Sequence, residues 1–309
     1  MNRPLRVALV GHGKIARDQH LPAISASADF QCVAVVDPVA QAVPQPWFAD
    51  VDALLASGLA FDAAVLCQPP QARYAAAVPL LQSGRHVLLE KPPGACVSEV
   101  DLLRDLARSR ACTLYCAWHS RHAPGVAPAT TWLRDRTVRS ATIHWKEDVR
   151  VWHPGQRWIW EAGGLGVFDP GINALSIATQ LLGSSLRVVE GSLSFPSNRD
   201  APVAAELELA TAAGAPVTVQ LEWLHPGPPV WDIEIVTTSG TLRLREGGGR
   251  LQIDGREVDA GSVREYASIY AAFAALVRRG DSEADVAPLQ VVADAFLRCR
   301  HRHVARFDG

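Results

Sequence analysis

One lysine stands where a titrating side chain could act on an alcohol. Lys91 lies in "LLEKPPGA", between Glu90 and two prolines, directly after the apolar run "HVLL". Such a run is typical of a buried strand, and open α/β sheets bind ligands at the carboxyl ends of their strands. A lysine held there by the adjacent carboxylate could orient or deprotonate a hydroxyl group. Taken alone, a lysine at a strand end is more often a solvated charge, so its role depends on other motifs.

A glycine-rich loop near the start of the chain predicts a dinucleotide site. The motif "GHGKIA" spans residues 11–16 and directly follows the strand-like run "RVALV". Gly11 permits a tight turn, Gly13 lets the backbone approach a pyrophosphate, and the small Ala16 allows close helix packing. Asp37 ends the next apolar run, "VAVVD", where its carboxylate would bind ribose hydroxyls and repel a 2′-phosphate. The combination predicts NAD as the cofactor, in preference to NADP.

Aromatic and polar side chains are concentrated between Trp145 and Trp160. This tract holds four of the nine tryptophans of the chain, together with Glu147 and His153. Indole faces pack against the C–H faces of a pyranose, while carboxylate and imidazole groups bind its hydroxyls. The tract therefore predicts a sugar site that includes Glu147, Trp152 and His153. The other three tryptophans could equally be core or interface anchors.

Short apolar runs in the first third of the chain predict the strands that carry the glycine loop, Asp37 and Lys91. These runs cover residues 6–11, 31–37, 61–67, 86–90 and 112–118, and helical patterns separate them. Apolar strands that alternate with helices predict a parallel sheet covered on both faces. The first part of the chain is therefore expected to be an α/β Rossmann domain with a doubly wound parallel sheet.

The second half of the chain has a different pattern. Runs such as "AAELELAT" and "PVTVQLEWL" alternate apolar and polar residues, which predicts a mostly antiparallel, open sheet with one covered face. We expect helices near residues 168–182, 266–279 and 289–299. The predicted domains are an NAD-binding Rossmann domain over residues 1–120 and a substrate-binding and oligomerisation α+β domain over residues 121–309.

Composition limits the classes of protein to which the chain can belong. The 309 residues are 48% hydrophobic and 20% charged, as in globular proteins, and are enough for two domains. A formal net charge of -2 without a basic run argues against nucleic acid or a membrane surface as the main partner. The start lacks the pattern of a signal peptide, and the six cysteines lack zinc-like spacing. We expect a cytoplasmic protein without a metal ion. We also expect a homo-oligomer, a dimer or tetramer, because an open sheet leaves one face to cover.

The glycine loop and the "EKP" motif together resemble the Gfo/Idh/MocA family of nicotinamide-dependent sugar oxidoreductases, over essentially the whole chain. A third element of that family is present as "GGLGVFDPGIN", residues 163–173. Its Asp169 and Asn173 are four residues apart at an expected helix start, so both would lie on one face, toward a cleft between the domains. The family most often has histidine at the later position. Asparagine can bond a hydroxyl but cannot act as a base, which shifts proton transfer to Lys91 and Asp169.

The resemblance implies a set of site residues. The implied cofactor-binding residues are Gly11, Gly13, Lys14, Ile15, Asp37, Cys67, Pro69, Glu90 and Lys91. The implied catalytic residues are Lys91, Asp169 and Asn173. The implied substrate-binding residues are His119, Glu147, Trp152, His153, Asp169 and Asn173. His20 could lie near the nicotinamide, although packing beneath the first helix is the favoured interpretation.

Within the family, motifs such as "GKIARDQHLPAI" and "WKEDVRVWHPGQRWIWE" are similar to those of bacterial aldose 1-dehydrogenases. Such enzymes oxidise D-galactose or L-arabinose to the lactone, and the two sugars share their ring stereochemistry. The similarity implies hydride transfer from the anomeric carbon to NAD, with Lys91 or Asp169 taking the hydroxyl proton. Two alternatives are an inositol or other sugar dehydrogenase of the family and a non-catalytic, NAD-binding regulator of a sugar pathway. The presence of Lys91, Asp169 and Asn173 favours an enzyme.

Overall fold

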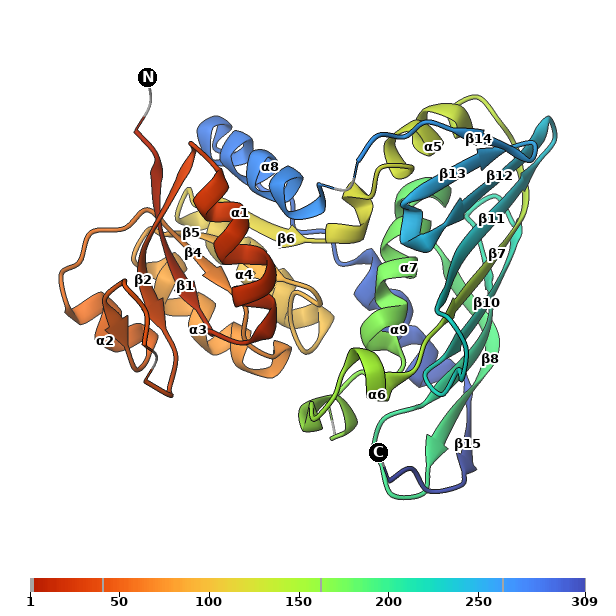
Figure 1. The fold of residues 1–309 in the computed structure, drawn as a ribbon, viewed down its shortest axis with the longest axis horizontal. Coiled ribbons are helices and arrows are strands. Elements are labelled where there is room, and N and C mark those ends of the chain that lie inside the picture. Colours follow the sequence, from red (N-terminus) through yellow and green to blue (C-terminus); the bar gives the residue numbers. More distant parts are fainter. Residues whose placement is uncertain (1–2, 41, 162, 263, 309) are drawn as a thin grey trace. The chain divides into compact units, whose positions relative to one another are not determined.

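The computed structural model describes residues 3–40, 42–161, 163–262 and 264–308. The chain divides into two compact units (Figure 1). One unit comprises residues 1–119 and 265–286, and the other comprises residues 120–264 and 287–309. The division predicted from the sequence differs in that it places residues 265–286 in the second domain and residue 120 in the first.

The first unit contains a sheet with the strand order of a Rossmann fold. In the described residues, six strands pair in the order β3 (Trp47–Phe48), β2 (Phe30–Val36), β1 (Leu5–Val10), β4 (Ala63–Leu66), β5 (His86–Glu90) and β6 (Leu114–Ala117). All neighbouring pairs are parallel, which confirms the predicted doubly wound sheet. The strand order reverses between β1 and β4, the point at which such sheets bind their ligands.

Helices cover this sheet, and one of them comes from the returning segment. The helical elements of the first unit are the π-helical turn η1 (Ala16–His20), α1 (Leu21–Ala26), α2 (Val51–Ala56), α3 (Pro70–Gln82), α4 (Val97–Ser109) and α8 (Glu265–Arg279). Val7 and Leu9 of β1 share one core cluster with Ile269 and Phe273 of α8, and all four side chains are fully buried. The hydrophobic core of the first unit therefore requires α8, although α8 follows most of the second unit in the sequence.

The second unit contains a larger, mixed sheet. In the described residues, nine strands pair in the order β14 (Arg256–Val258), β13 (Arg250–Ile253), β12 (Gly240–Arg245), β11 (Val230–Thr237), β7 (Val138–Lys146), β10 (Pro216–Glu222), β9 (Ala204–Ala210), β8 (Arg187–Pro196) and β15 (Arg300–Val304). Two pairs, β10 with β7 and β15 with β8, are parallel, and the others are antiparallel. The predicted mostly antiparallel sheet is therefore confirmed.

Helix α7 packs closely on this sheet and carries part of the candidate site. The remaining helical elements are η2 (His119–His122), α5 (Val126–Leu133), α6 (Val149–Trp152), η3 (Arg157–Trp160), α7 (Phe168–Leu182), η4 (Glu246–Gly248) and α9 (Ala287–Arg298). A Cβ at Gly171 of α7 would lie 2.6 Å from Leu221 Cδ1 of β10, so a larger residue there would have to displace the Leu221 side chain. The three predicted helices agree with α7, α8 and α9. Within the described part of the chain, no helix is long and apolar enough to cross a membrane.

Candidate active site

The glycine loop follows β1 and touches the loop after β4. Gly11 has a φ of +88°, and a Cβ at this residue would lie 2.9 Å from the backbone nitrogen of Gln68. The Gly11 N–H donates to the carbonyl of Val36 at 2.7 Å, which ties the loop to the end of β2. A side chain at residue 11 would therefore be strained and would displace backbone. Around Gly13, no described atom beyond its chain neighbours lies within 4 Å of a Cβ position, so a ligand has room to approach this backbone.

Asp37 follows β2 and shapes the same loop. Its Oδ2 accepts the backbone N–H of His12 at 2.8 Å, and its Oδ1 accepts that of Val39 at 2.9 Å. A carboxylate offers about four acceptor positions, so each oxygen retains capacity for another donor. Asp37 can thus hold the glycine loop and accept ribose hydroxyls with the same carboxylate. The loop, the helix that follows it and Asp37 together fit a dinucleotide.

The other residues expected at the cofactor have more varied surroundings. Lys14 is exposed and forms an ion pair with Asp18, one helical turn later. Ile15 packs against the hydrophobic core of the first unit. Cys67 is buried just after β4, and Pro69 is exposed just before α3. Lys14 and Pro69 are thus accessible to a ligand, whereas Ile15 and Cys67 pack in the hydrophobic core of the first unit.

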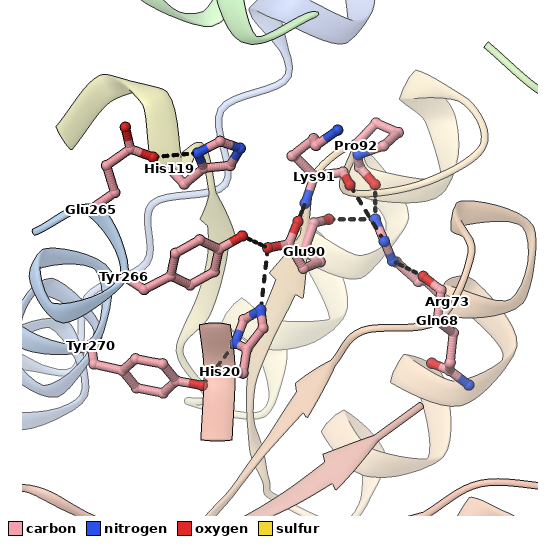
Figure 2. A network of polar contacts seen from close by, with 10 residues as sticks. All are labelled: His20, Gln68, Arg73, Glu90, Lys91, Pro92, His119, Glu265, Tyr266 and Tyr270. Atoms are coloured by element: carbon pink, nitrogen blue, oxygen red, sulfur yellow. Dashed lines mark hydrogen bonds and ion pairs between the residues drawn. The ribbon is translucent and has the colours of Figure 1, made fainter. Parts of the chain in front are cut away.

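Lys91 directly follows β5, and its backbone is held from two sides (Figure 2). Glu90 is only 2% exposed, and its Oε2 accepts the Lys91 N–H at 2.6 Å. The buried guanidinium of Arg73 donates to the carbonyls of Glu90 and Pro92, and to that of Lys91 at 3.4 Å. Arg73 also donates to the carbonyl of Gln68 at 2.8 Å, which joins the loops after β4 and β5. Nothing in the sequence predicts this role, because an arginine in a helical pattern is usually exposed.

Glu90 is also the centre of a buried polar network (Figure 2). The hydroxyl of Tyr266 donates to Glu90 Oε1 at 2.7 Å, and Nε2 of His20 lies 3.2 Å from the same oxygen. Nδ1 of His20 lies 2.8 Å from the hydroxyl of Tyr270. His20 is fully buried, as expected for a packing role, but its imidazole also binds the carboxylate next to Lys91. The motif "DQHLPAI" contains no signal for this contact.

Burial and charge act in opposite directions on this network. Burial alone would lower the pKa of His20, but the charges and hydrogen bonds of Cys67 and Glu90 outweigh it and raise that pKa to about 10. Burial would raise the pKa of Glu90, but His20, together with His119 and Tyr266, lowers it to about 2. Burial and the adjacent Glu90 charge raise the pKa of Tyr266 well above its usual value. His20 and Glu90 therefore form a buried ion pair at neutral pH.

His119, expected to bind substrate, lies at the border of this network. Its Nδ1 is 2.6 Å from Glu265 Oε2, at the start of α8. Its ring stacks on that of Tyr266, with centroids 5.6 Å apart and an interplanar angle of 18°. The structure thus places His119 against the first turn of α8, and its role in binding a substrate stays a prediction.

In the second unit, the structure brings together three of the predicted site residues. Nε2 of His153 lies 3.3 Å from Glu147 Oε1, and its Nδ1 lies 3.5 Å from Asp169 Oδ2. Glu147 follows β7, His153 follows α6, and Asp169 is in the first turn of α7. Both carboxylates are buried, at 3% and 4% exposure. His153 therefore connects two buried carboxylates that are far apart in the sequence.

One buried atom of this cluster has unused bonding capacity. Nδ1 of His153 makes no hydrogen bond with any described group, since its approach to Asp169 is too long to be one. Buried polar atoms are rarely left unsatisfied, and such an atom is often the partner of a ligand or water. The His153 imidazole is therefore suited to bind a ligand hydroxyl beside Asp169.

Two tryptophans from outside the predicted tract hold Glu147. Trp223 donates its indole N–H to Glu147 Oε1 at 3.2 Å, and Trp231 donates to Oε2 at 2.9 Å. Trp152 is 45% exposed, and its ring contacts Trp231 edge to face, with centroids 5.1 Å apart. Trp145 also stacks on Trp231, with ring centroids 6.0 Å apart. The indoles of Trp223 and Trp231 thus orient Glu147, a role that no spacing in the sequence indicates.

Asn173 and the glycine motif before it complete the set of predicted residues. Asn173 is one turn after Asp169 in α7, and its carbonyl accepts the hydroxyl of Ser176 at 2.7 Å. In the preceding loop, a Cβ at Gly166 would lie 2.2 Å from the carbonyl oxygen of Pro202, and one at Gly164 would meet the backbone of η3. These two glycines therefore let protein backbone approach closely. Among the described residues, no group of histidine, cysteine and acidic side chains could hold a metal ion.

Comparison with known proteins places the chain in a family. Residues 5–117 match the model of the oxidoreductase family with an NAD-binding Rossmann fold, GFO_IDH_MocA, and residues 136–243 match the GFO/IDH/MocA C-terminal domain. The chain is 43% identical over 298 residues to a galactose 1-dehydrogenase of Pseudomonas fluorescens, covering 96% of each chain. The chain therefore belongs to the Gfo/Idh/MocA family of oxidoreductases, as its motifs indicate.

Solved structures agree with this assignment. The structure of a D-galactose-1-dehydrogenase protein from Rhizobium etli matches with a TM-score of 0.95 and 46% identity, covering 99% of each chain. A 3-ketoreductase from Actinomadura kijaniata, solved with NADP and TDP-benzene, matches with a TM-score of 0.86 at 20% identity, covering 98% of this chain and 100% of that chain. The second likeness shows the fold alone. The protein is an oxidoreductase with an NAD-binding Rossmann domain.

Proposed function

We propose that the protein is an NAD-dependent aldose 1-dehydrogenase that oxidises D-galactose or L-arabinose at the anomeric carbon. The observation that carries this proposal is the 43% identity to a galactose 1-dehydrogenase, which extends over 96% of both chains. The D-galactose-1-dehydrogenase structure supports the same substrate class at 46% identity.

The cluster in the second unit supports a hydroxyl-rich substrate. Glu147 already accepts two indole N–H groups and lies beside His153, so its main effect is to fix the imidazole. The unsatisfied Nδ1 of His153 and the nearby carboxylate of Asp169 are the groups proposed to bind sugar hydroxyls. The exposed indole of Trp152 offers an apolar face for the C–H groups of a pyranose.

In the proposed reaction, the sugar loses a hydride from its anomeric carbon and a proton from its anomeric hydroxyl, and becomes the aldonolactone. When bound, NAD supplies the hydride acceptor. Either Lys91 or Asp169 is proposed to accept this proton. The amide of Asn173 would orient the hydroxyl, since it can donate and accept but cannot take the proton.

NAD is the proposed cofactor because of Asp37. Its two carboxylate oxygens are fixed by the N–H groups of His12 and Val39, which prevents the carboxylate from turning away. A fixed negative charge favours the 2′-hydroxyl of NAD and repels the 2′-phosphate of NADP. The homo-oligomeric state expected from the open sheet stays a prediction.

The test is NADH absorbance after mixing the protein and NAD with D-galactose, L-arabinose, D-glucose, D-xylose and myo-inositol in parallel. The first two sugars are expected to give the highest rates. A rate with myo-inositol or another sugar alone would favour a different dehydrogenase of the family. Absence of signal with every compound would favour a non-catalytic regulator.

Variants test the proposed proton acceptors. Lys91→Ala and Asp169→Ala should each lower kcat by roughly a hundredfold, the range of general acid–base catalysis. Lys146→Ala is the control, because its ammonium donates to Gln220 at 3.1 Å within the sheet of the second unit and has no proposed role in the reaction. Near-normal turnover in both Lys91→Ala and Asp169→Ala would exclude this mechanism.

A further inference from the structure

We propose that Tyr266 is a positioning residue for Lys91 and acts through the buried carboxylate of Glu90. The inference rests on the proposed function only in assigning the proton transfer to Lys91. Tyr266 donates to one oxygen of Glu90 at 2.7 Å, and the other oxygen accepts the Lys91 N–H at 2.6 Å. A single carboxylate thus connects the Tyr266 hydroxyl with the backbone of the lysine (Figure 2).

The geometry makes this connection rigid. A carboxylate is planar, so rotation of the Glu90 group would break its bonds to Tyr266, His20 and Lys91 together. Glu90 is 2% exposed, and water therefore has little access to replace a lost donor. At the following peptide, between Lys91 and Pro92, Arg73 donates to the Lys91 carbonyl at 3.4 Å. Both ends of the Lys91 backbone are thus held by buried charged groups.

The connection depends on the return of α8 to the first unit. The first turn of α8 supplies Tyr266, which contacts Glu90, and Glu265, which contacts His119 at 2.6 Å. One turn later, Tyr270 contacts His20 at 2.8 Å. Tyr266 therefore reaches the carboxylate directly, whereas Tyr270 reaches it only through the imidazole of His20.

This difference gives a matched pair of variants. Tyr266→Phe and Tyr270→Phe each remove one buried hydroxyl from the same helix, and both side chains are at least nine-tenths buried. Tyr266→Phe should lower kcat by roughly tenfold or more, because small displacements of a catalytic group cost activity steeply, while KM changes little. Tyr270→Phe should have a much smaller effect on kcat with a comparable loss of thermal stability. Equal effects of the two variants on kcat would show that Tyr266 is merely structural.

A second measurement needs neither substrate nor cofactor. The chain has only three lysines, Lys14, Lys91 and Lys146, so trace acetylation followed by peptide mass spectrometry resolves each one. Lys14 is exposed on the surface and serves as the internal reference. The acetylation rate of Lys91 relative to Lys14 should change in Tyr266→Phe and stay at the wild-type value in Tyr270→Phe. An unchanged ratio in Tyr266→Phe would overturn the proposal.

The two measurements separate this inference from the proposed function. If the wild-type protein oxidises none of the sugars, the proposed function fails, and the acetylation ratio still decides whether Tyr266 positions Lys91. If it oxidises D-galactose but the acetylation ratio in Tyr266→Phe equals that of wild type, only the positioning role fails. Unfolding of Tyr266→Phe would be visible in its thermal melt. In that case, Glu90→Gln is the second variant. The glutamine amide keeps the shape of the Glu90 carboxylate but has only one oxygen that can accept a hydrogen bond. Glu90→Gln should lower kcat and change the acetylation ratio, and wild-type values for both would overturn the proposal.

Discussion

The buried pair of His20 and Glu90 makes a specific prediction about stability and pH. Burial opposes protonation of His20, but Cys67 and Glu90 raise its pKa from 6.5 to about 10 in the folded protein. A group whose pKa is raised by folding stabilises the fold fully below its unfolded pKa, and that stabilisation is lost as the pH rises through the folded pKa. The relevant window for His20 is therefore pH 6.5 to 10. Glu90, with its pKa lowered from 4.5 to about 2, contributes fully above pH 4.5 and does not change in this window.

The size of the effect follows from these two pKa values. Between pH 7 and pH 9, the linkage relation gives a loss of on the order of 2 to 3 kcal/mol from His20 alone. Such a loss corresponds to a fall in Tm of several degrees for a unit of this size. The measurement is a series of thermal melts of wild type at pH 7, 8 and 9.

His20→Gln is the variant that isolates this contribution. Its amide nitrogen can still donate to Glu90 but carries no titrating charge. The variant should be less stable than wild type at pH 7, and the difference between the two should become smaller toward pH 9. If the melting temperatures of wild type and His20→Gln fall in parallel over this range, His20 is not a buried imidazolium and the reasoning is wrong.

Two further predictions concern the cofactor loop. Gly11→Ala should weaken NAD binding by roughly tenfold or more, because a φ of +88° costs an alanine about 1–2 kcal/mol and its Cβ would lie 2.9 Å from Gln68 backbone. Protein fluorescence titrated with NAD measures this, and wild-type affinity would show that the loop does not hold the cofactor. Asp37→Ser should raise the ratio of NADP to NAD turnover, since it removes the fixed negative charge after β2. Unchanged selectivity would remove Asp37 from its proposed role.

Much of the first unit could be predicted because its signals are local. Apolar strand runs, the glycine loop and Asp37 are short patterns whose physical meaning does not depend on the rest of the chain. The structure places Gly11, Gly13 and Asp37 at the strand ends where the sequence predicts them. For the same reason, the helix from Phe168 to Leu182 and the position of Asp169 in its first turn could be predicted.

The supporting contacts could not be predicted because they join distant segments. Tyr266 and Glu90 are 176 residues apart, and Trp231 and Glu147 are 84 apart. A tyrosine on the buried face of a helix has the same local pattern whether its hydroxyl meets a carboxylate or another group. The return of α8 to the first unit depends on tertiary packing in the same way. Sequence patterns therefore identify the candidate reacting groups, whereas the structure shows what holds them.

The most direct test of the proposed reaction follows the hydrogen on the anomeric carbon. D-galactose deuterated at C1 is mixed with the protein and NAD, and the reduced cofactor is analysed by mass spectrometry. In the proposed reaction, the reduced cofactor carries the deuterium and the sugar becomes the lactone. Reduced cofactor without deuterium would show that the hydride comes from another carbon and would contradict an aldose 1-dehydrogenase.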